Sequence, residues 1–240
     1  MTSRLLLFAL LLVATISRRA AADDFADGTV AARAGDFSKA ALAFKKSIQA
    51  QPSSGGLVNL GIAEWQSGHA GVALLAWEQA AWLNPQDAAA RKNLKFARQV
   101  MQVDAPELHW FETLSTWLPP ITWAWLAGAG LWLAGGALVL PRVFRRKKSD
   151  GLQALAALGV CIFIFALTAN VGLVSRRDIG FVVKKNAALR LTPTSGSELH
   201  STLPAGEPLR RVKTRGNYFF VRTPMASGWI ARDQVGFINE

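Results

Sequence analysis

Two long stretches without charge constrain this chain more than any other feature. No charged residue occurs from Thr113 to Pro141 or from Gly151 to Val174. A helix needs about 20 apolar residues to cross the hydrocarbon core of a bilayer, because each residue advances it by about 1.5 Å. Both stretches are long enough, and a buried helix of a soluble protein seldom stays free of charge over such a length. We therefore expect two membrane spans, over residues 119–141 and 151–174, that form an antiparallel hairpin.

Side chains near the first span fit this assignment. Tryptophan favours the headgroup level of a bilayer, and four lie at the start of the span: Trp110, Trp117, Trp123 and Trp125. Residues 101–118 are therefore expected to form an interfacial linker. Small residues let two helices approach closely, and both spans contain them: Gly128, Gly130, Gly135, Gly136, Ala157 and Gly159.

The loop between the spans, residues 142–150, is strongly basic. It contains one acid and five cations, Arg142, Arg145, Arg146, Lys147 and Lys148. Short loops rich in Lys and Arg stay on the cytoplasmic side of a membrane. A solvated charge cluster or a nucleic-acid patch is the alternative, but the position between two spans favours a topology signal. Both flanking regions then lie outside the cytoplasm, although Arg176 and Arg177, on the predicted outer side, weaken the argument.

The N-terminus supports the same orientation. Arg4 precedes an apolar run, and three alanines ending at Ala22 follow it, which is typical of a secretory signal peptide over residues 1–22. Arg18 and Arg19 near the cleavage site leave an uncleaved anchor as the alternative. The predicted location is a bacterial inner membrane, with two spans and with periplasmic N- and C-terminal domains.

The charge balance excludes nucleic acid as the expected partner. The formal net charge is +11, but residues 23–112 contribute −2, the loop +4 and residues 175–240 +6. Only the C-terminal region is therefore a basic domain. The single cysteine, Cys161, lies inside the second span, so neither flanking domain has a disulfide or a thiol ligand.

Residues 23–100 repeat with a period of 33. Five pairs match at this spacing: Gly28 with Gly61, Gly35 with Gly68, Ala40 with Ala73, Phe44 with Trp77, and Pro52 with Pro85. The small residues fit where the two helices of a repeat cross closely, and the large aromatic fills the gap to the next repeat. The second glycine makes the turn between the helices, and the proline stops the second helix. Residues 86–99 then form a closing helix, with Leu94 and Phe96 partly facing the core.

This pattern resembles the tetratricopeptide repeat, whose usual period is 34 residues. The resemblance implies a short groove lined by the first helix of each repeat, with Arg33, Val58 and Trp65 as candidate protein-binding residues; Ile62 is better explained by packing. The first repeat departs from the pattern, because Asp24 and Asp27 stand where Trp and Leu are usual. A Lys and Asn pattern for holding a C-terminal carboxylate is missing, which argues against chaperone-type peptide capture.

Residues 175–240 change to alternating apolar positions broken by Gly and Pro, which predicts five short strands in a small barrel. The segments "LRLTPTSGSE", "LPAGEPLRRV", "NYFFVRT" and "GWIARDQV" resemble the bacterial SH3 family. That resemblance implies binding of cell-wall peptides or of other proteins. Tyr218 and Trp229 are the candidate binding residues, and packing of Trp229 inside the barrel is the alternative.

The sequence thus predicts a multidomain membrane protein with an all-α tetratricopeptide-repeat solenoid, a two-helix transmembrane hairpin and an all-β SH3-like barrel. This domain order resembles the BatE-like proteins of the aerotolerance operon, which occur beside MoxR-type ATPases and von Willebrand A domain proteins. The resemblance implies a non-enzymatic envelope scaffold whose partners are other membrane proteins of that group. A wall anchor, in which the SH3-like barrel holds a peptidoglycan peptide, is the alternative.

Catalytic chemistry is not expected. His69, His109 and His200 lie in three separate segments, and the chain lacks zinc-ligand, nucleophile and phosphate-loop motifs. Asp23, Asp24 and Asp27 could hold a cation, but a solvated acidic N-terminus explains them better. We therefore expect neither an enzyme nor a bound metal or cofactor.

Overall fold

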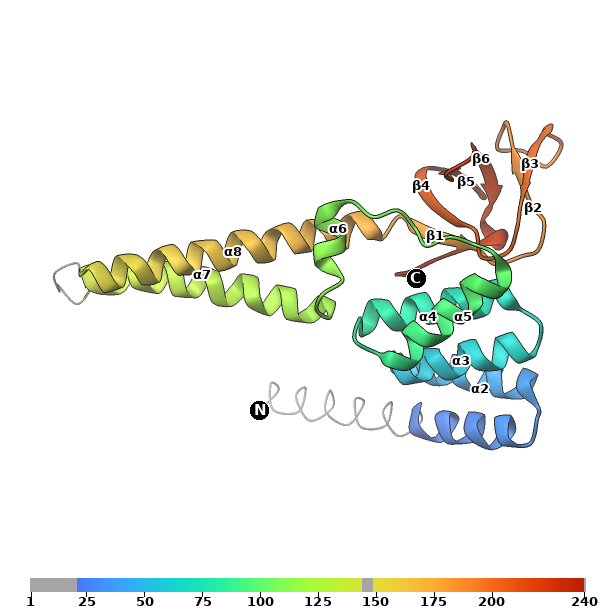
Figure 1. Ribbon diagram of the computed structural model, residues 1–240, viewed down its shortest axis with the longest axis horizontal. Helices are drawn as coiled ribbons and strands as arrows, with labels where there is room; N and C mark the ends of the chain where they lie inside the picture. Colours follow the sequence, from blue (N-terminus) through green and yellow to red (C-terminus); the bar gives the residue numbers. More distant parts are fainter. Residues whose placement is uncertain (1–20, 144–148, 240) are drawn as a thin grey trace, which may run out of the picture. The chain divides into compact units, whose positions relative to one another are not determined.

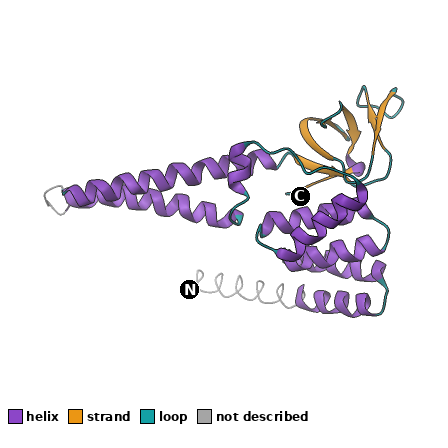
Figure 2. Ribbon diagram, viewed as in Figure 1, coloured by secondary structure: helices purple, strands orange, loops and turns teal. Residues whose placement is uncertain are grey.

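A computed structural model describes residues 21–143 and 149–239, apart from the side chain of Arg142. The chain divides into two compact units. One joins the chain up to Pro106 with Asp178–Glu240, and the other is Glu107–Arg177. Figure 2 shows that the described strands belong to the C-terminal part, whereas the rest is helical. The predicted signal peptide, residues 1–22, lies outside the described residues except for its last two, which are helical.

The first unit begins with a stack of helices that follow one another in the chain (Figure 1). Residues 21–33 are helical, and the helices after them are α2 (Phe37–Ala50), α3 (Ser54–Gln66), α4 (Ala70–Leu83) and α5 (Ala88–Met101). Gly35 and Gly68 turn the chain before α2 and α4 with φ of 78° and 83°, the left-handed region that glycine tolerates best. The predicted turns are therefore confirmed.

The 33-residue period reappears as packing. Phe44 and Trp77 are each 2% exposed, and Ala40 and Ala73 are fully buried. A Cβ added at Gly28 would lie 2.7 Å from the Phe44 ring, and one added at Gly61 would lie 2.6 Å from Cδ1 of Trp77. Each large aromatic therefore packs directly on a glycine sixteen residues earlier. The sequence predicted that the rings fill the gap to the next repeat and did not predict this contact.

The rest of the first unit is a seven-stranded antiparallel sheet in the order β3-β2-β6-β5-β4-β1-β7. The strands are β1 (Ile179–Val182), β2 (Ala187–Arg190), β3 (Leu199–Leu203), β4 (Pro208–Arg215), β5 (Tyr218–Arg222), β6 (Ser227–Ala231) and β7 (Val235–Phe237). The sequence predicted five strands, two fewer than the described residues contain. One reason is that it treated the segment after Ser227, which forms β6 and β7, as a single closing piece. Side chains from both ends of the sheet form its core, among them Val182, Leu189, Phe219, Val221, Ile230 and Phe237.

Helix α4 packs directly against this sheet. Gly71 faces the carbonyl oxygens of Val182 and Val183, where an added Cβ would lie 2.7 Å from each. Gln79 also donates from Nε2 to the carbonyl oxygen of Phe237, at 3.0 Å. The helical region and the sheet therefore form one compact unit, although the chain between them passes through the second unit.

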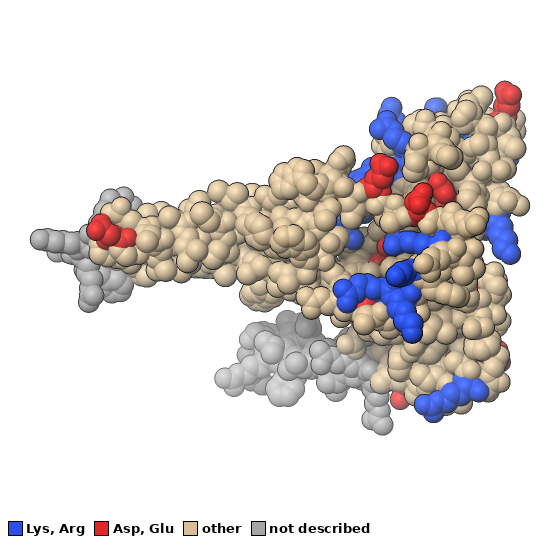
Figure 3. Space-filling view, viewed as in Figure 1, with Lys and Arg blue, Asp and Glu red and all other residues tan. Residues whose placement is uncertain are grey.

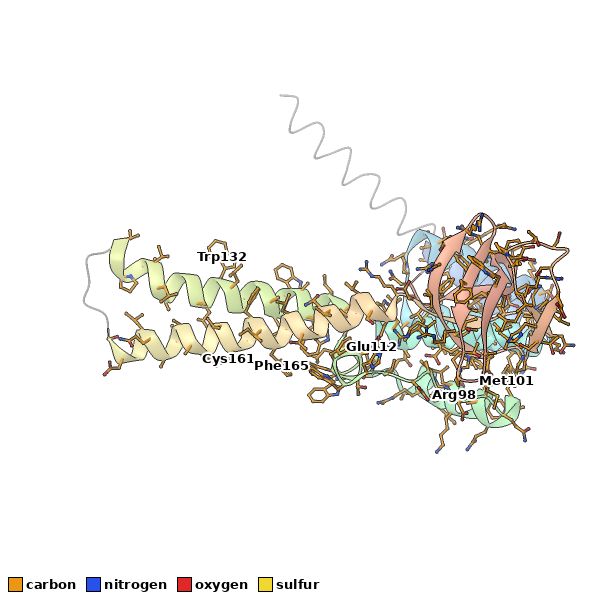
Figure 4. All side chains as sticks on the ribbon, turned by 90° about the horizontal axis from the view of Figure 1, so that it is seen from above. Arg98, Met101, Glu112, Trp132, Cys161 and Phe165 are labelled. Atoms are coloured by element: carbon orange, nitrogen blue, oxygen red, sulfur yellow. The ribbon has the colours of Figure 1, made fainter. Side chains whose placement is uncertain are left out.

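The second unit consists of α6 (Trp110–Ser115), α7 (Pro120–Val143) and α8 (Asp150–Arg176). Helices α7 and α8 are each long enough and apolar enough to cross a membrane, over Pro120–Pro141 and Asp150–Arg176. Figure 4 shows Trp132 and Cys161 projecting away from the contact between the two helices.

Two of the predicted glycines bring α7 and α8 together. A Cβ added at Gly130 would lie 2.7 Å from the main-chain nitrogen of Phe163, and one at Gly159 would lie 2.5 Å from that of Ala134. A Cβ added at Gly128 or Gly135 would meet no atom of the other helix within 4 Å, so the prediction that these two serve close helix packing is wrong.

A buried polar cluster joins α6 to the end of α8. Glu112 is fully buried, and its carboxylate accepts from Ser175 Oγ at 2.5 Å and from the main-chain nitrogen of His109 at 2.9 Å. Arg176, also buried, donates from Nη1 to Ser115 Oγ at 3.2 Å. The cluster contains the acidic Glu112 and the basic Arg176, and it buries one of the two cations that follow the second predicted span.

The tryptophans near the first span differ in environment. Trp110, Trp117 and Trp125 are exposed, as expected of residues at a bilayer surface. Trp123 is 1% exposed, and its Nε1 donates to the carbonyl oxygen of Ser115 at 3.3 Å. Trp123 therefore fixes α6 against α7, and its ring is buried by the protein whereas the other three are exposed.

Candidate functional site

The predicted groove residues of the helical region do not share one surface. Val58 is 6% exposed, and its carbonyl oxygen accepts a hydrogen bond from Trp77 Nε1 at 3.1 Å. A side chain buried to this degree is unable to contact a partner, so its assignment as a binding residue is wrong. Arg33 is exposed at the end of the first helix.

An apolar patch lies on α3 and α5. Trp65 is only partly exposed, because its ring packs between Trp77 and Phe96, with centroids 5.7 and 5.4 Å away. Ile62 is 41% exposed and Phe96 is 49% exposed. Ile62 was expected to pack but is exposed, whereas Trp65 was expected to be exposed but is largely packed. Phe96 follows Ile62 by 34 residues, the offset between the starts of α3 and α5, and that spacing could have identified it. We call Ile62, Trp65 and Phe96 the apolar patch.

Beside this patch, α5 presents basic side chains. An open depression of about 770 Å³ runs along the helix and the segment after it, lined by Arg91, Leu94, Lys95, Arg98, Gln99, Gln102, Val103, Asp104 and Ala105. Arg98 forms an ion pair with the largely buried Glu78 of α4. Figure 3 shows Lys and Arg side chains gathered over the helical region where α5 lies.

In the sheet, Tyr218 and Trp229 are half-buried on the outer face. The side chains between them in the alternating pattern, Phe219 and Ile230, point into the core. Trp229 lies opposite Phe220 in the register of β5 and β6, and the two rings meet edge to face with centroids 5.3 Å apart. Packing inside the barrel is therefore not the role of Trp229. Phe220 was missed by the sequence analysis, although its alternation with Phe219 places it on the outer face.

The predicted topology signal falls mostly outside the described residues. The main chain of Arg142 belongs to α7, and Arg145, Arg146, Lys147 and Lys148 lie beyond it in the part of the loop that the structure does not describe.

The three histidines lie on separate parts of the described chain. Over residues 21–143 and 149–239, no group of three or more His, Cys, Asp or Glu could hold a metal ion. His69 pairs with Glu64 before α4, His109 begins α6, and His200 lies on β3.

Three carboxyl groups outside the candidate spans have shifted pKa values. The hydroxyl of Ser54 lowers the pKa of Asp87, and Lys184 lowers that of Asp233. Burial raises the pKa of Glu207, with a smaller contribution from Asp104. Each shift has a local structural cause, and the three groups lie on separate segments.

Comparison with family models, with curated proteins and with solved structures gives no match to this chain.

Proposed function

We propose that the protein is a non-enzymatic scaffold of a bacterial inner membrane, which binds partner proteins through tetratricopeptide-like repeats and an SH3-like domain. The observation that carries this proposal is the apolar patch of Ile62, Trp65 and Phe96 on helices of the repeat type. Apolar side chains grouped on a surface that the described residues leave partly exposed are typical of protein-binding sites. Helices α7 and α8 supply two segments of the length and composition that anchoring requires.

The division of the chain into units supports the proposed topology. The helical region and the sheet form one unit, so they have to lie in the same compartment. The chain between them must then cross the membrane an even number of times, as a two-span hairpin does. The basic loop and the N-terminal apolar segment favour the periplasm for this unit.

Cysteine labelling tests the topology on the full chain. In a Cys161→Ala background, a single cysteine replaces Met225 in the sheet region, Ser38 in α2 or Ser149 in the loop, all exposed positions. In intact spheroplasts, a membrane-impermeant maleimide should label the first two and reach Ser149→Cys only after lysis. Labelling of Ser149→Cys alone would invert the topology, and opposite results for the first two would exclude a single folded unit.

Photo-crosslinking tests the scaffold role in living cells. A photoreactive amino acid at Ile62 or Phe96 should give discrete products with other membrane proteins, and one at the exposed Lys45 on α2 is the matched control. By the resemblance in domain order to BatE-like aerotolerance proteins, we propose von Willebrand A domain proteins among these products. Equal products from all three positions, or none, would contradict the proposed site.

A second candidate function is favoured by the half-exposed Tyr218, Phe220 and Trp229 on the sheet. In that case the SH3-like domain holds peptidoglycan peptides and the hairpin anchors the envelope layer. Co-sedimentation of the detergent-solubilised chain with purified sacculi should then be lost on Trp229→Ala, with Trp125→Ala in the second unit as control. Sedimentation that Trp229→Ala leaves unchanged would exclude the sheet face as the wall-binding site.

A further inference from the structure

The outer face of the sheet carries an ordered row of side chains. Register places Arg190 of β2 opposite Trp229 of β6, Trp229 opposite Phe220 of β5, and Phe220 opposite Lys213 of β4. Directly opposed residues of an antiparallel pair point to the same face. Four neighbouring strands therefore present a cation, two aromatic rings and a second cation in sequence across the sheet.

A second row reinforces the first. Tyr218 lies opposite Arg215 on β4, one alternation away from Phe220 and Lys213. The described strands β2, β4, β5 and β6 contain no acidic and no carboxamide side chain. We call Arg190, Lys213, Arg215, Tyr218, Phe220 and Trp229 the basic aromatic face.

The cations of this face are available to a ligand. Lys213 and Arg215 are exposed, and neither forms an ion pair with any acid among the described residues. Arg190 donates from Nη1 to the carbonyl oxygen of Ser197 at 2.5 Å. That bond holds one side of its guanidinium, and the remaining donors can meet a carboxylate.

We propose that the basic aromatic face binds an extended acidic peptide segment of a partner protein. Carboxylates suit Arg and Lys, and rings with open faces hold apolar side chains and peptide planes between them. Recognition of a sugar chain would need hydrogen-bond acceptors for its hydroxyl groups, and the four strands supply no carboxylate or carboxamide for this purpose.

Geometry specifies the spacing of the acids. Neighbouring strands lie about 4.8 Å apart, so Arg190 and Lys213 are separated by three spacings, roughly 14 Å. An extended peptide advances about 3.3 Å per residue, so residues four apart span roughly 13 Å and point to the same side. The face therefore fits two acids at positions i and i+4 with an apolar residue at i+2. This inference deepens the proposed function of the sheet region and rests on it only in taking the partner to be a protein.

Labelled peptides test the spacing directly. The probes are Gly-Glu-Thr-Val-Thr-Glu-Gly, with acids four apart, and its isomer Gly-Glu-Thr-Val-Glu-Thr-Gly, with acids three apart. A third probe has both Glu replaced by Gln. Fluorescence anisotropy with the full chain in an uncharged detergent should show the first probe binding at least about fivefold more tightly than the isomer. Binding of the Gln probe should be weaker still.

A charge-reversal pair locates the binding. Lys213→Glu with Arg215→Glu should weaken the first probe at least about tenfold, because two attractive charges become repulsive. The matched control, Lys45→Glu with Lys46→Glu on α2, makes the same change in net charge and should leave affinity unchanged. Circular dichroism checks the fold, and Lys213→Gln with Arg215→Gln should give an intermediate loss.

Four results would overturn the inference: no binding of the first probe at millimolar concentration, equal binding of the isomer, equal binding of the Gln probe, or affinity unchanged by the reversal pair. Displacement of the probe from this face at lower concentration by muropeptides or by phosphatidylglycerol vesicles would also overturn it, in favour of the wall or the membrane. Crosslinking at Ile62 and Phe96 does not involve this face. Its persistence in the reversal variant would separate a failure of this inference from a failure of the scaffold proposal.

Discussion

At the scale of single residues, the repeat spacing predicted which large rings are buried. Phe44 and Trp77 were expected to be buried between helices, and both are. Their contact with Gly28 and Gly61 was not predicted, because the spacing alone does not say which residues of a repeat touch. Exposure on one helix was predicted less well: Ile62 and Trp65 are neighbours on α3, and which of them packs depends on Phe96 of another helix.

Gly61 should be intolerant of even one methyl group. In Gly61→Ala the new Cβ would overlap the Trp77 ring, so we expect the free energy of unfolding to fall by about 1–3 kcal/mol. Gly55→Ala in the same helix meets nothing within 4 Å and should be neutral or raise stability by up to about 1 kcal/mol. Chemical denaturation of the detergent-solubilised chain measures both; equal effects would show that the ring does not occupy this position.

Removal of the packed rings should cost more. Trp77→Ala and Phe44→Ala should each lower the free energy of unfolding by about 3–5 kcal/mol, because both leave cavities between helices. Phe96→Ala, which removes a half-exposed ring, should cost much less. Thermal unfolding followed by circular dichroism ranks the three, and a loss for Phe96→Ala as large as for Trp77→Ala would contradict the assigned packing.

At the scale of elements, sequence periodicity located most helices and most strands, because each depends on a local pattern. Helix α6 (Trp110–Ser115) was missed, because it lies in the predicted linker of residues 101–118. The junctions between elements were missed. Glu112 and Ser175 are 63 residues apart, and no local pattern indicates that their side chains meet. The same holds for Gly71 on α4, whose lack of a side chain becomes meaningful only beside the sheet.

Asp87 should make the stability of α5 depend on pH. Its Oδ1 accepts from the main-chain nitrogens of Ala89 and Ala90 at 2.9 and 3.1 Å, and Ser54 Oγ donates to Oδ2. The pKa of Asp87 in the folded chain is lowered, first by this hydroxyl, so its stabilisation is complete above the unfolded pKa of about 3.9. That stabilisation is lost as the pH falls through the folded pKa.

Asp87→Asn should therefore lower the free energy of unfolding at pH 6 and have little effect near pH 2, and Asp87→Ala should lose about 1 kcal/mol of capping as well. Urea unfolding at the two pH values measures the difference. Ser54→Ala should weaken the pH dependence without removing the main-chain cap. A deficit of Asp87→Asn that is the same at both pH values would show that the carboxylate charge is not involved.

The basic loop should act through charge rather than through side-chain identity. Replacement of Arg142, Arg145, Arg146, Lys147 and Lys148 by Gln should leave part of the population misinserted, because basic side chains near a span gain roughly 1 kcal/mol each from the anionic inner leaflet. Replacement of the three arginines by Lys keeps that gain and should insert normally. The cysteine-labelling assay measures orientation. Correct insertion of the Lys variant with loss of complementation would show that arginine contacts a partner in the cytoplasm.

At the scale of the whole molecule, the sequence predicted two separate outer domains, whereas the structure joins them. The contact depends on Gly71, Gly206 and Gly236, each close to a side chain or carbonyl of the other region. Glycines have many structural uses, so these three gave no signal in the sequence. The candidate binding surfaces were predicted only in part for the same reason, because the row of Arg190, Trp229 and Lys213 exists only once strand register is fixed.

Gly71→Leu should uncouple the two regions. A leucine there would displace the carbonyls of Val182 and Val183, and the helical region and the sheet should then unfold in two thermal transitions instead of one. Gly55→Leu, on α3 in open space, is the control and should keep a single transition. Differential scanning calorimetry distinguishes these outcomes, and a single transition in Gly71→Leu would mean that the contact does not couple the regions.

The hydrogen bond from Gln79 to Phe237 can form only after nearly the whole chain has been synthesised, because the two residues are 158 positions apart. A ribosome adds about 5–20 residues per second, so α4 is complete on the order of ten seconds before the last strand exists. During that interval the side of α4 that carries Gly71 and Gln79 has no sheet to cover it. Proteases and holdase chaperones of the compartment could then bind this uncovered side before the sheet has formed. A nascent chain that stalls after the hairpin would therefore be a target for degradation even though its helices have formed.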